Sequence, residues 1–175
     1  MRPLIAVVGS SQATKEVQNV AVEVGREIIK AGFSLICGGL KGVMEAACKG
    51  AFSETGAGSG RIIGILPGIN KGDANPYVDI IIPTGIGYAR NMIIACSADA
   101  VIAVSGGAGT LSEMSMAWQY GKPVVVINGL PGITGSVIGK SLESGPLDTR
   151  RKDKVEGADT AEEAVALINK TLVKR

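Results

Sequence analysis

Short apolar runs alternate with amphipathic segments along most of the chain. The runs have the length of β-strands and little polar alternation, which is typical of strands buried on both faces. They comprise residues 4–8, 33–37, 62–66, 78–82, 100–104 and 124–127. Because helical segments separate these runs, the pattern predicts a parallel sheet with helices packed on both of its faces.

The segments between the runs repeat with helical periodicity. In residues 15–30, Val17 and Val24 share one apolar face, and Gly32 follows as a C-terminal stop signal. Further helices are expected at residues 43–52, 89–98, 111–120 and 160–173. The predicted fold is a doubly wound, Rossmann-like α/β sheet. A length of 175 residues fits one such domain over 1–175.

Three predicted strands are each followed by a glycine-rich segment. In a doubly wound sheet, ligands bind beyond the carboxyl ends of the strands, so we expect these segments to line one crevice. They are Gly9-Ser10-Ser11, Gly38-Gly39-Leu40-Lys41-Gly42 and residues 106–110. Ser10 and Ser11 fit two interpretations, ligand contact or capping of the following helix.

The third segment carries the strongest signal. Gly106, Gly107 and Gly109 join a strand to a helix, and glycine allows both positive φ and close approach of backbone to a ligand. The free N–H groups and the positive dipole end of the new helix, near Thr110, favour an anion. The sequence therefore predicts a binding site for a phosphate ester.

Two charged residues stand out in a region where charges are scarce. Arg90 opens an apolar helix, where a cation is unfavourable unless an anion lies nearby. A structural salt bridge is the other explanation for Arg90. Glu113 lies close to the predicted anion site and could act in acid–base chemistry. Thr110-Leu111-Ser112-Glu113 also fits a capping box, in which the Glu113 carboxylate would only support the helix.

Composition narrows the chemistry. The chain has no histidine, so histidine-based triads and histidine metal ligands are excluded, and no metal site is expected. The dinucleotide fingerprint and the Gly-Lys-Ser/Thr phosphate loop are both absent, which disfavours NAD binding and ATP hydrolysis as functions. Cys37, Cys48 and Cys96 sit in apolar surroundings and are expected to be buried packing residues without a disulfide framework.

Partners and location follow from charge and hydropathy. A net charge of +2 without a basic run makes nucleic acid an unlikely partner. The longest uncharged segment, residues 123–139, is interrupted by prolines and glycines, so no membrane span is expected. The apolar stretch at residues 4–8 is too short for a signal peptide, and we expect a cytoplasmic protein. Residues 129–151 have no clear pattern and are expected to form a surface loop or a lid.

The motifs resemble those of the LOG-like superfamily, which includes cytokinin-activating phosphoribohydrolases and proteins once labelled possible lysine decarboxylases. The family pattern Pro-Gly-Gly-x-Gly-Thr-x-x-Glu is similar to residues 105–113, with Ser105 in place of proline. Its Gly-Gly-Gly-x-x-Gly-Leu-Met-Gly pattern is similar to residues 37–45, which include Met44. Its Arg-Lys pair resembles Arg90-Asn91. Residues 64–68, 78–79 and 84–90 are similar to the molybdenum cofactor carrier branch.

The resemblance implies a homodimeric nucleotide-binding fold with Arg90 and Glu113 as catalytic residues. It also implies that residues 106–110 hold phosphate. The other two glycine-rich segments are predicted to complete the nucleotide site, through Gly9, Ser10, Gly38, Gly39, Gly42 and Met44. It offers no lysine for pyridoxal phosphate, so lysine decarboxylation is rejected. Two hypotheses remain. The first is cleavage of the N-glycosidic bond of a nucleoside 5′-monophosphate, with no required cofactor. The second is non-catalytic carriage of the molybdenum cofactor.

Overall fold

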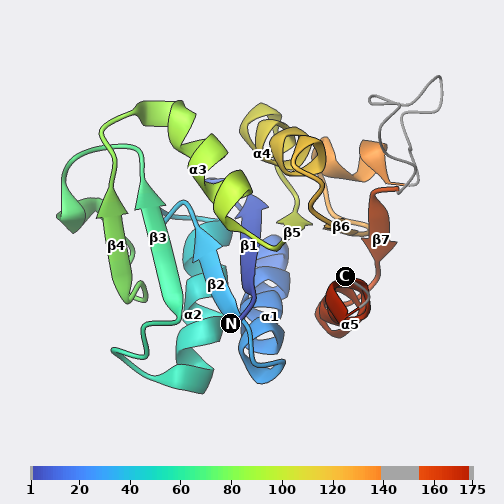
Figure 1. Ribbon diagram of the computed structural model, residues 1–175, viewed down its shortest axis with the longest axis horizontal. Helices are drawn as coiled ribbons and strands as arrows, with labels where there is room; N and C mark the ends of the chain where they lie inside the picture. The colour runs from blue at the N-terminus through green and yellow to red at the C-terminus, as the bar shows by residue number, and fades with distance from the viewer. Residues whose placement is uncertain (1, 139–153, 174–175) are drawn as a thin grey trace.

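The computed structural model describes residues 2–138 and 154–173, and its strands form one entirely parallel sheet (Figure 1). In spatial order the sheet contains β4 (Ile80–Pro83), β3 (Ile62–Leu66), β2 (Ser34–Cys37), β1 (Leu4–Gly9), β5 (Ala100–Val104), β6 (Val124–Ile127) and β7 (Glu156–Ala158). The chain moves outward from β1 in one direction and returns to the other side of β1 at β5. This confirms the predicted doubly wound α/β fold.

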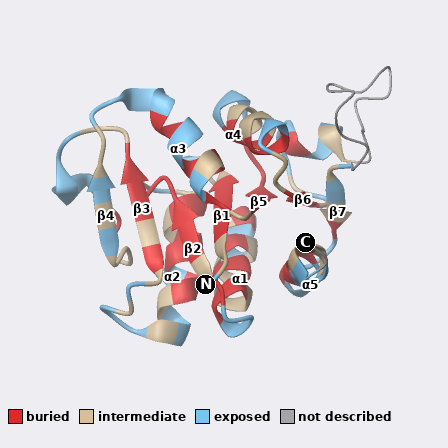
Figure 2. Ribbon diagram, in the orientation of Figure 1, coloured by how far each residue is buried: buried red, intermediate tan, exposed pale blue. Residues whose placement is uncertain are grey.

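Helices cover both faces of the sheet (Figure 1). One layer contains α1 (Lys15–Lys30), α2 (Val43–Thr55) and α5 (Ala161–Val173), and the other contains α3 (Arg90–Ser97) and α4 (Ala108–Gln119). Side chains of β1 alternate between the two layers: Ile5 and Val7 pack with the first, Ala6 and Val8 with the second. The central strands are accordingly buried along their length (Figure 2).

Two glycines allow α1 and α2 to pack closely. A Cβ on Gly25 would lie 1.9 Å from the Ala47 carbonyl oxygen, and one on Gly50 would lie 1.8 Å from that of Val22. Each helix therefore has no side chain where it meets the backbone of the other. Close packing brings the loops that precede the two helices together, and the Val43 amide donates to the Ser10 carbonyl oxygen at 3.0 Å.

Several element boundaries differ from the sequence prediction. α4 begins at Ala108, three residues before the predicted start, and the short edge strand β7 was not predicted. Three 3-10 turns were also missed: η1 (Lys71–Asp73), η2 (Gly87–Ala89) and η3 (Thr134–Val137). Of the predicted loop at residues 129–151, the part from residue 139 onward lies outside the described residues.

The order of the strands reverses between β1 and β5, which are hydrogen-bonded neighbours. Gly9 at the end of β1 is paired with Val104 at the end of β5, and a Cβ on Gly9 would lie 2.4 Å from the Val104 carbonyl oxygen. The chain then leaves the two strands towards opposite faces, which opens a crevice between the loops.

In the part of the chain that the structure describes, no helix is both long and apolar enough to span a membrane.

Candidate functional site

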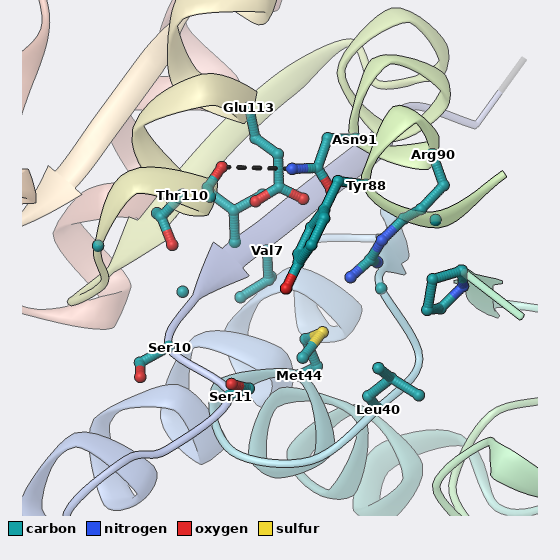
Figure 3. A pocket seen from close by; sticks show the side chains of 17 residues that line it. Val7, Ser10, Ser11, Leu40, Met44, Tyr88, Arg90, Asn91, Thr110 and Glu113 are labelled. Atoms are coloured by element: carbon teal, nitrogen blue, oxygen red, sulfur yellow. Dashed lines mark hydrogen bonds between the residues drawn. The ribbon is translucent and has the colours of Figure 1, made fainter.

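A cavity of about 540 Å³ occupies this crevice (Figure 3). The loops after β1, β2 and β5 contribute to its wall together with the turn that precedes α3. Its lining comprises Val7, Val8, Gly9, Ser10, Ser11, Gly38, Leu40, Met44, Pro67, Gly87, Tyr88, Arg90, Asn91, Gly107, Gly109, Thr110 and Glu113. The structure therefore brings together residues from segments distant in the sequence, including both predicted catalytic residues.

The first turn of α4 forms one wall of the cavity. Gly107 is its N-cap residue and no side chain caps the helix, so the amides of Ala108, Gly109 and Thr110 have no acceptor recorded among the described residues. A Cβ on Gly107 or Gly109 would meet no protein atom within 4 Å. Protein packing therefore does not require glycine at these two positions. The open space beside exposed amides at a helix N-terminus suits an anionic ligand.

Ser105 gives the turn before α4 an unusual backbone. Its φ is +58°, the one positive value at a non-glycine residue in the described chain, and its hydroxyl donates to the Pro131 carbonyl oxygen at 2.6 Å. Proline holds φ near −65°, so it could not adopt this conformation. The serine that replaces the proline of the related motif therefore permits a turn that the motif's own residue excludes.

Glu113 does not form the predicted capping box. Because α4 begins at Ala108, Thr110 lies within the first turn instead of capping the helix, and Glu113 lies one turn further along. The Glu113 carboxyl points into the cavity, with no hydrogen bond recorded among the described residues (Figure 3). The capping interpretation is wrong, and the carboxyl is available to a ligand.

Burial raises the pKa of the Glu113 carboxyl. The residue is 7% exposed, and loss of solvent raises the pKa of its carboxyl from 4.5 to about 7, against the opposing effect of the positive charge on Arg90. A carboxyl with this pKa exchanges its proton near neutral pH. It is therefore suited to acid–base work at the pH of most cells.

Arg90 is buried beside the loop that follows β2. Its Nη1 donates to the Ile65 carbonyl oxygen at 3.1 Å, while its Nε is buried without a partner among the described residues. The predicted alternative, a structural salt bridge, is not found among them, since no carboxylate lies within 4.0 Å of the guanidinium. Arg90 and Glu113 thus line one cavity and interact electrostatically without direct contact.

Asn91 links the two helices that border the cavity. Its Nδ2 donates to the Gly109 carbonyl oxygen at 3.4 Å and to the Ser112 hydroxyl at 3.1 Å, and that hydroxyl donates to the same carbonyl at 2.7 Å (Figure 3 shows the first contact). Asn91 therefore holds the first turn of α4 against α3. The sequence marked Asn91 only as a departure from a lysine, with no signal for this role.

Three predicted binding residues do not line the cavity. Gly39, Gly42 and Gly106 all have positive φ, of +70°, +72° and +130°. A Cβ on Gly42 would lie 2.4 Å from the Ser10 carbonyl oxygen, and one on Gly106 would lie 2.3 Å from the Thr110 hydroxyl oxygen. These glycines shape the loops behind the cavity wall. Gly9, Ser10, Gly38 and Met44 do line it, as do Gly107, Gly109 and Thr110.

The capping interpretation of Ser10 is wrong as well. The hydroxyl of Thr14, not that of Ser10, accepts the Val17 amide and caps α1. The Ser10 hydroxyl instead donates to the Gln12 carbonyl oxygen at 2.6 Å and accepts the Gln12 amide at 3.1 Å. This turn holds Ser10 at the edge of the cavity.

Among the described residues, no three histidine, cysteine, aspartate or glutamate side chains cluster as metal ligands would. Cys37 and Cys48 are buried with their Sγ atoms 3.4 Å apart, beneath the loop that follows β2, and Cys96 is half-buried. Sequence reasoning also gave no role to Tyr88, which borders the cavity from the turn before α3 (Figure 3).

Comparison with known proteins identifies the family of this chain. Residues 2–165 match the SLOG cluster4 family. The chain belongs to that family. Among its relatives by sequence, an uncharacterized protein of Archaeoglobus fulgidus is 44% identical over 72% of this chain and 84% of its own length. A cytokinin riboside 5′-monophosphate phosphoribohydrolase of Arabidopsis thaliana is 30% identical over 94% of this chain and 80% of its own. The resemblance seen in the motifs is confirmed.

A solved structure gives a second comparison for this SLOG cluster4 chain. The molybdenum cofactor binding protein from Rippkaea orientalis superposes with a TM-score of 0.84, at 34% identity over 98% of both chains. The molybdenum cofactor carrier protein from Chlamydomonas reinhardtii superposes with a TM-score of 0.80, at 32% identity over 99% of both. The proteins similar to this chain therefore include both a named enzyme and named cofactor binding and carrier proteins.

Proposed function

We propose that this protein hydrolyses the N-glycosidic bond of a nucleoside 5′-monophosphate. Water would add to the anomeric carbon of the ribose as the bond to the base breaks, giving the free base and ribose 5-phosphate. The observation that carries the proposal is the buried carboxyl of Glu113, which has a pKa of about 7 and no partner recorded among the described residues, in the same cavity as Arg90 and the open amides of α4. The phosphoribohydrolase relatives support it.

Each part of the cavity has a role in this reaction. The amides at the start of α4 bind the phosphate, and Gly107 and Gly109 leave room for it. Within residues 2–138 and 154–173, Nε of Arg90 has no acceptor, and the guanidinium binds phosphate or ribose oxygens. Ionised Glu113 orients the attacking water and stabilises the positive charge that develops on the sugar ring.

The decisive experiment measures adenine release from AMP by chromatography, for wild type and for Glu113→Gln. Wild type is expected to produce adenine and ribose 5-phosphate in equal amounts. Because a transition-state interaction is lost, Glu113→Gln is expected to lower the rate by at least about 100-fold. Its affinity for AMP should remain close to that of wild type, as measured by calorimetry. Wild type that binds AMP without turnover would contradict the proposal.

A second candidate is non-catalytic carriage of a phosphorylated pterin such as the molybdenum cofactor. Two observations favour it: the full-length likeness to the carrier and binding proteins, and Asn91 at the position of the lysine in the hydrolase pattern. A carrier would use the same amides for the phosphate ester of its cargo. Protein purified from a molybdopterin-producing host would then retain a pterin, detected by fluorescence after oxidation and release.

We further propose that the protein forms a homodimer through the face that carries η2 and α3. Ile86, Met92 and Ile93 there are 48%, 49% and 36% exposed, an unusual amount of apolar surface for neighbouring positions. Analytical ultracentrifugation of wild type and of Ile93→Glu tests this: the variant should dissociate into monomers.

The cytoplasmic location, the single domain and the absence of a nucleic-acid partner or required cofactor stay predictions from the sequence.

A further inference from the structure

Aromatic side chains make up only 3% of the chain, and most are accounted for by packing. Phe33 and Trp118 are buried, and the rings of Phe52 and Tyr77 meet edge to face with centroids 5.6 Å apart. Tyr88 is different because it is 87% exposed although it lines the cavity. An aromatic ring left in water beside a ligand cavity gains stabilisation when a ligand covers it.

The backbone that carries Tyr88 is held in place. The Gly85 amide donates to the Gly68 carbonyl oxygen at 3.1 Å, and the Gly87 amide donates to that of Pro67 at 3.0 Å. Both glycines have positive φ, of +69° and +60°. The turn before α3 is therefore fixed to the loop that follows β3, while the ring itself packs against little protein. Such a ring is positioned in advance for a contact from the cavity.

The cavity has two chemically different ends. Thr110 and Ser10 lie at the end with the open amides, and Leu40 lies at the other (Figure 3). In this view the Tyr88 ring lies between the two ends of the cavity. Leu40 and Met44 give the far end an apolar wall, and the flat guanidinium of Arg90 borders it. This end is suited to a flat ring with little charge.

We propose that Tyr88 stacks on the heteroaromatic ring of the phosphorylated ligand and holds it against the wall formed by Leu40 and Met44. The inference rests on the proposed function and extends it, because it assigns the element that selects a ring-bearing phosphate ester over a bare sugar phosphate. The amides of α4 bind a group that both ligands share. Tyr88 contacts a group that only the nucleotide has.

The experiment compares AMP with ribose 5-phosphate by calorimetry, in a Glu113→Gln background so that AMP is not consumed. Three further variants are used: Tyr88→Ala, Tyr88→Phe and Tyr120→Ala. Tyr120 is the matched control, since it is 48% exposed at the end of α4 and does not line the cavity.

Tyr88→Ala is expected to weaken AMP binding by roughly 5- to 150-fold, because base–aromatic stacking is lost. Affinity for ribose 5-phosphate should change less than about twofold. Tyr88→Phe should restore AMP binding, since it keeps the ring, and Tyr120→Ala should match the background protein. A pattern in which Tyr88→Ala weakens both ligands equally, or neither, overturns the inference.

Two further outcomes separate this inference from the proposals on which it rests. Binding of ribose 5-phosphate as tightly as AMP leaves the phosphate cradle intact and contradicts stacking by Tyr88. Binding of neither ligand contradicts the proposed function and, with it, the ligand class argued here. Sedimentation of each variant gives the last control. If Tyr88→Ala changes the oligomeric state together with AMP affinity, the ring belongs to a subunit interface and the inference is wrong.

Discussion

Gly38 leaves the space that the guanidinium of Arg90 occupies. A Cβ on Gly38 would lie 1.7 Å from Nη1 of Arg90, and that same Nη1 donates to the Ile65 carbonyl oxygen at 3.1 Å. The loop after β2 and the start of α3 are thus fitted to one another at the cavity wall. Glycine at residue 38 is explained by the position of a charged side chain from a segment far along the sequence.

Gly38→Ala should therefore displace Arg90 and weaken AMP binding by about tenfold or more, the loss of a charge-assisted hydrogen bond. The fold should persist, because the obstructing atoms are the end of a flexible side chain. Calorimetry with AMP and thermal unfolding measure the two effects. Gly135→Ala, where an added Cβ meets nothing within 4 Å, is the matched control. Wild-type affinity in Gly38→Ala would show that Arg90 does not contact the ligand.

Substitution of Gly109 should stabilise the fold and weaken ligand binding at the same time. It lies inside α4, and an added Cβ meets no protein atom within 4 Å. Gly109→Ala should raise the free energy of unfolding by about 0.4–1 kcal/mol, because alanine restricts the unfolded chain more than glycine does. The same methyl group enters the proposed phosphate site and should weaken AMP binding. Thermal unfolding and calorimetry on one sample test both, and a variant with unchanged affinity would contradict the phosphate site.

The central fold could be predicted because each buried strand is a continuous apolar run and each helix a periodic one. β7 was not predicted because Glu156-Gly157-Ala158 is short and carries a charge. It lies at the edge of the sheet, where a strand pairs with a single neighbour. The start of α4 was placed too late because Gly109 disfavours a helix interior by propensity. In the structure that residue lies in the first turn, facing open space.

The candidate site could be predicted in part. Glycine loops at strand ends and isolated charges leave a local signal, which is why Arg90 and Glu113 were found. Asn91 and Tyr88 were named only as parts of motifs, and nothing in the sequence indicated their roles, since these depend on contacts between α3, α4 and the loop after β3. The capping-box interpretation of Glu113 failed because spacing alone does not fix where a helix begins.

The three cysteines should differ in reactivity. Cys37 and Cys48 are buried, and contact with Cys37 together with burial raises the pKa of the Cys48 thiol, while Cys96 is partly exposed. A maleimide should therefore label one thiol of the native protein, at Cys96, and three after unfolding in denaturant, as counted by mass spectrometry. Rapid labelling of Cys37 in the native state would show that the loop after β2 opens readily.

Glu113 should make stability depend on pH in a direction opposite to that of most carboxylates. Its pKa is about 7 in the folded protein and near 4.5 when unfolded, so between these values the folded state holds a proton that the unfolded state has lost. The free energy of unfolding should fall as pH rises through this window, by up to about 3 kcal/mol for this group alone.

Glu113→Gln removes that titration. The variant should gain stability relative to wild type as pH rises from about 4.5 to 8. Burial of the glutamine amide also changes the free energy of unfolding, but by an amount that does not vary with pH. Urea unfolding of both proteins across this range measures the difference. The same ionisation should switch on hydrolysis, because only the carboxylate stabilises a developing cation, so the AMP hydrolysis rate of wild type should rise through pH 7. A stability difference that stays flat across the range would place the carboxyl in contact with water and remove the physical basis for its raised pKa.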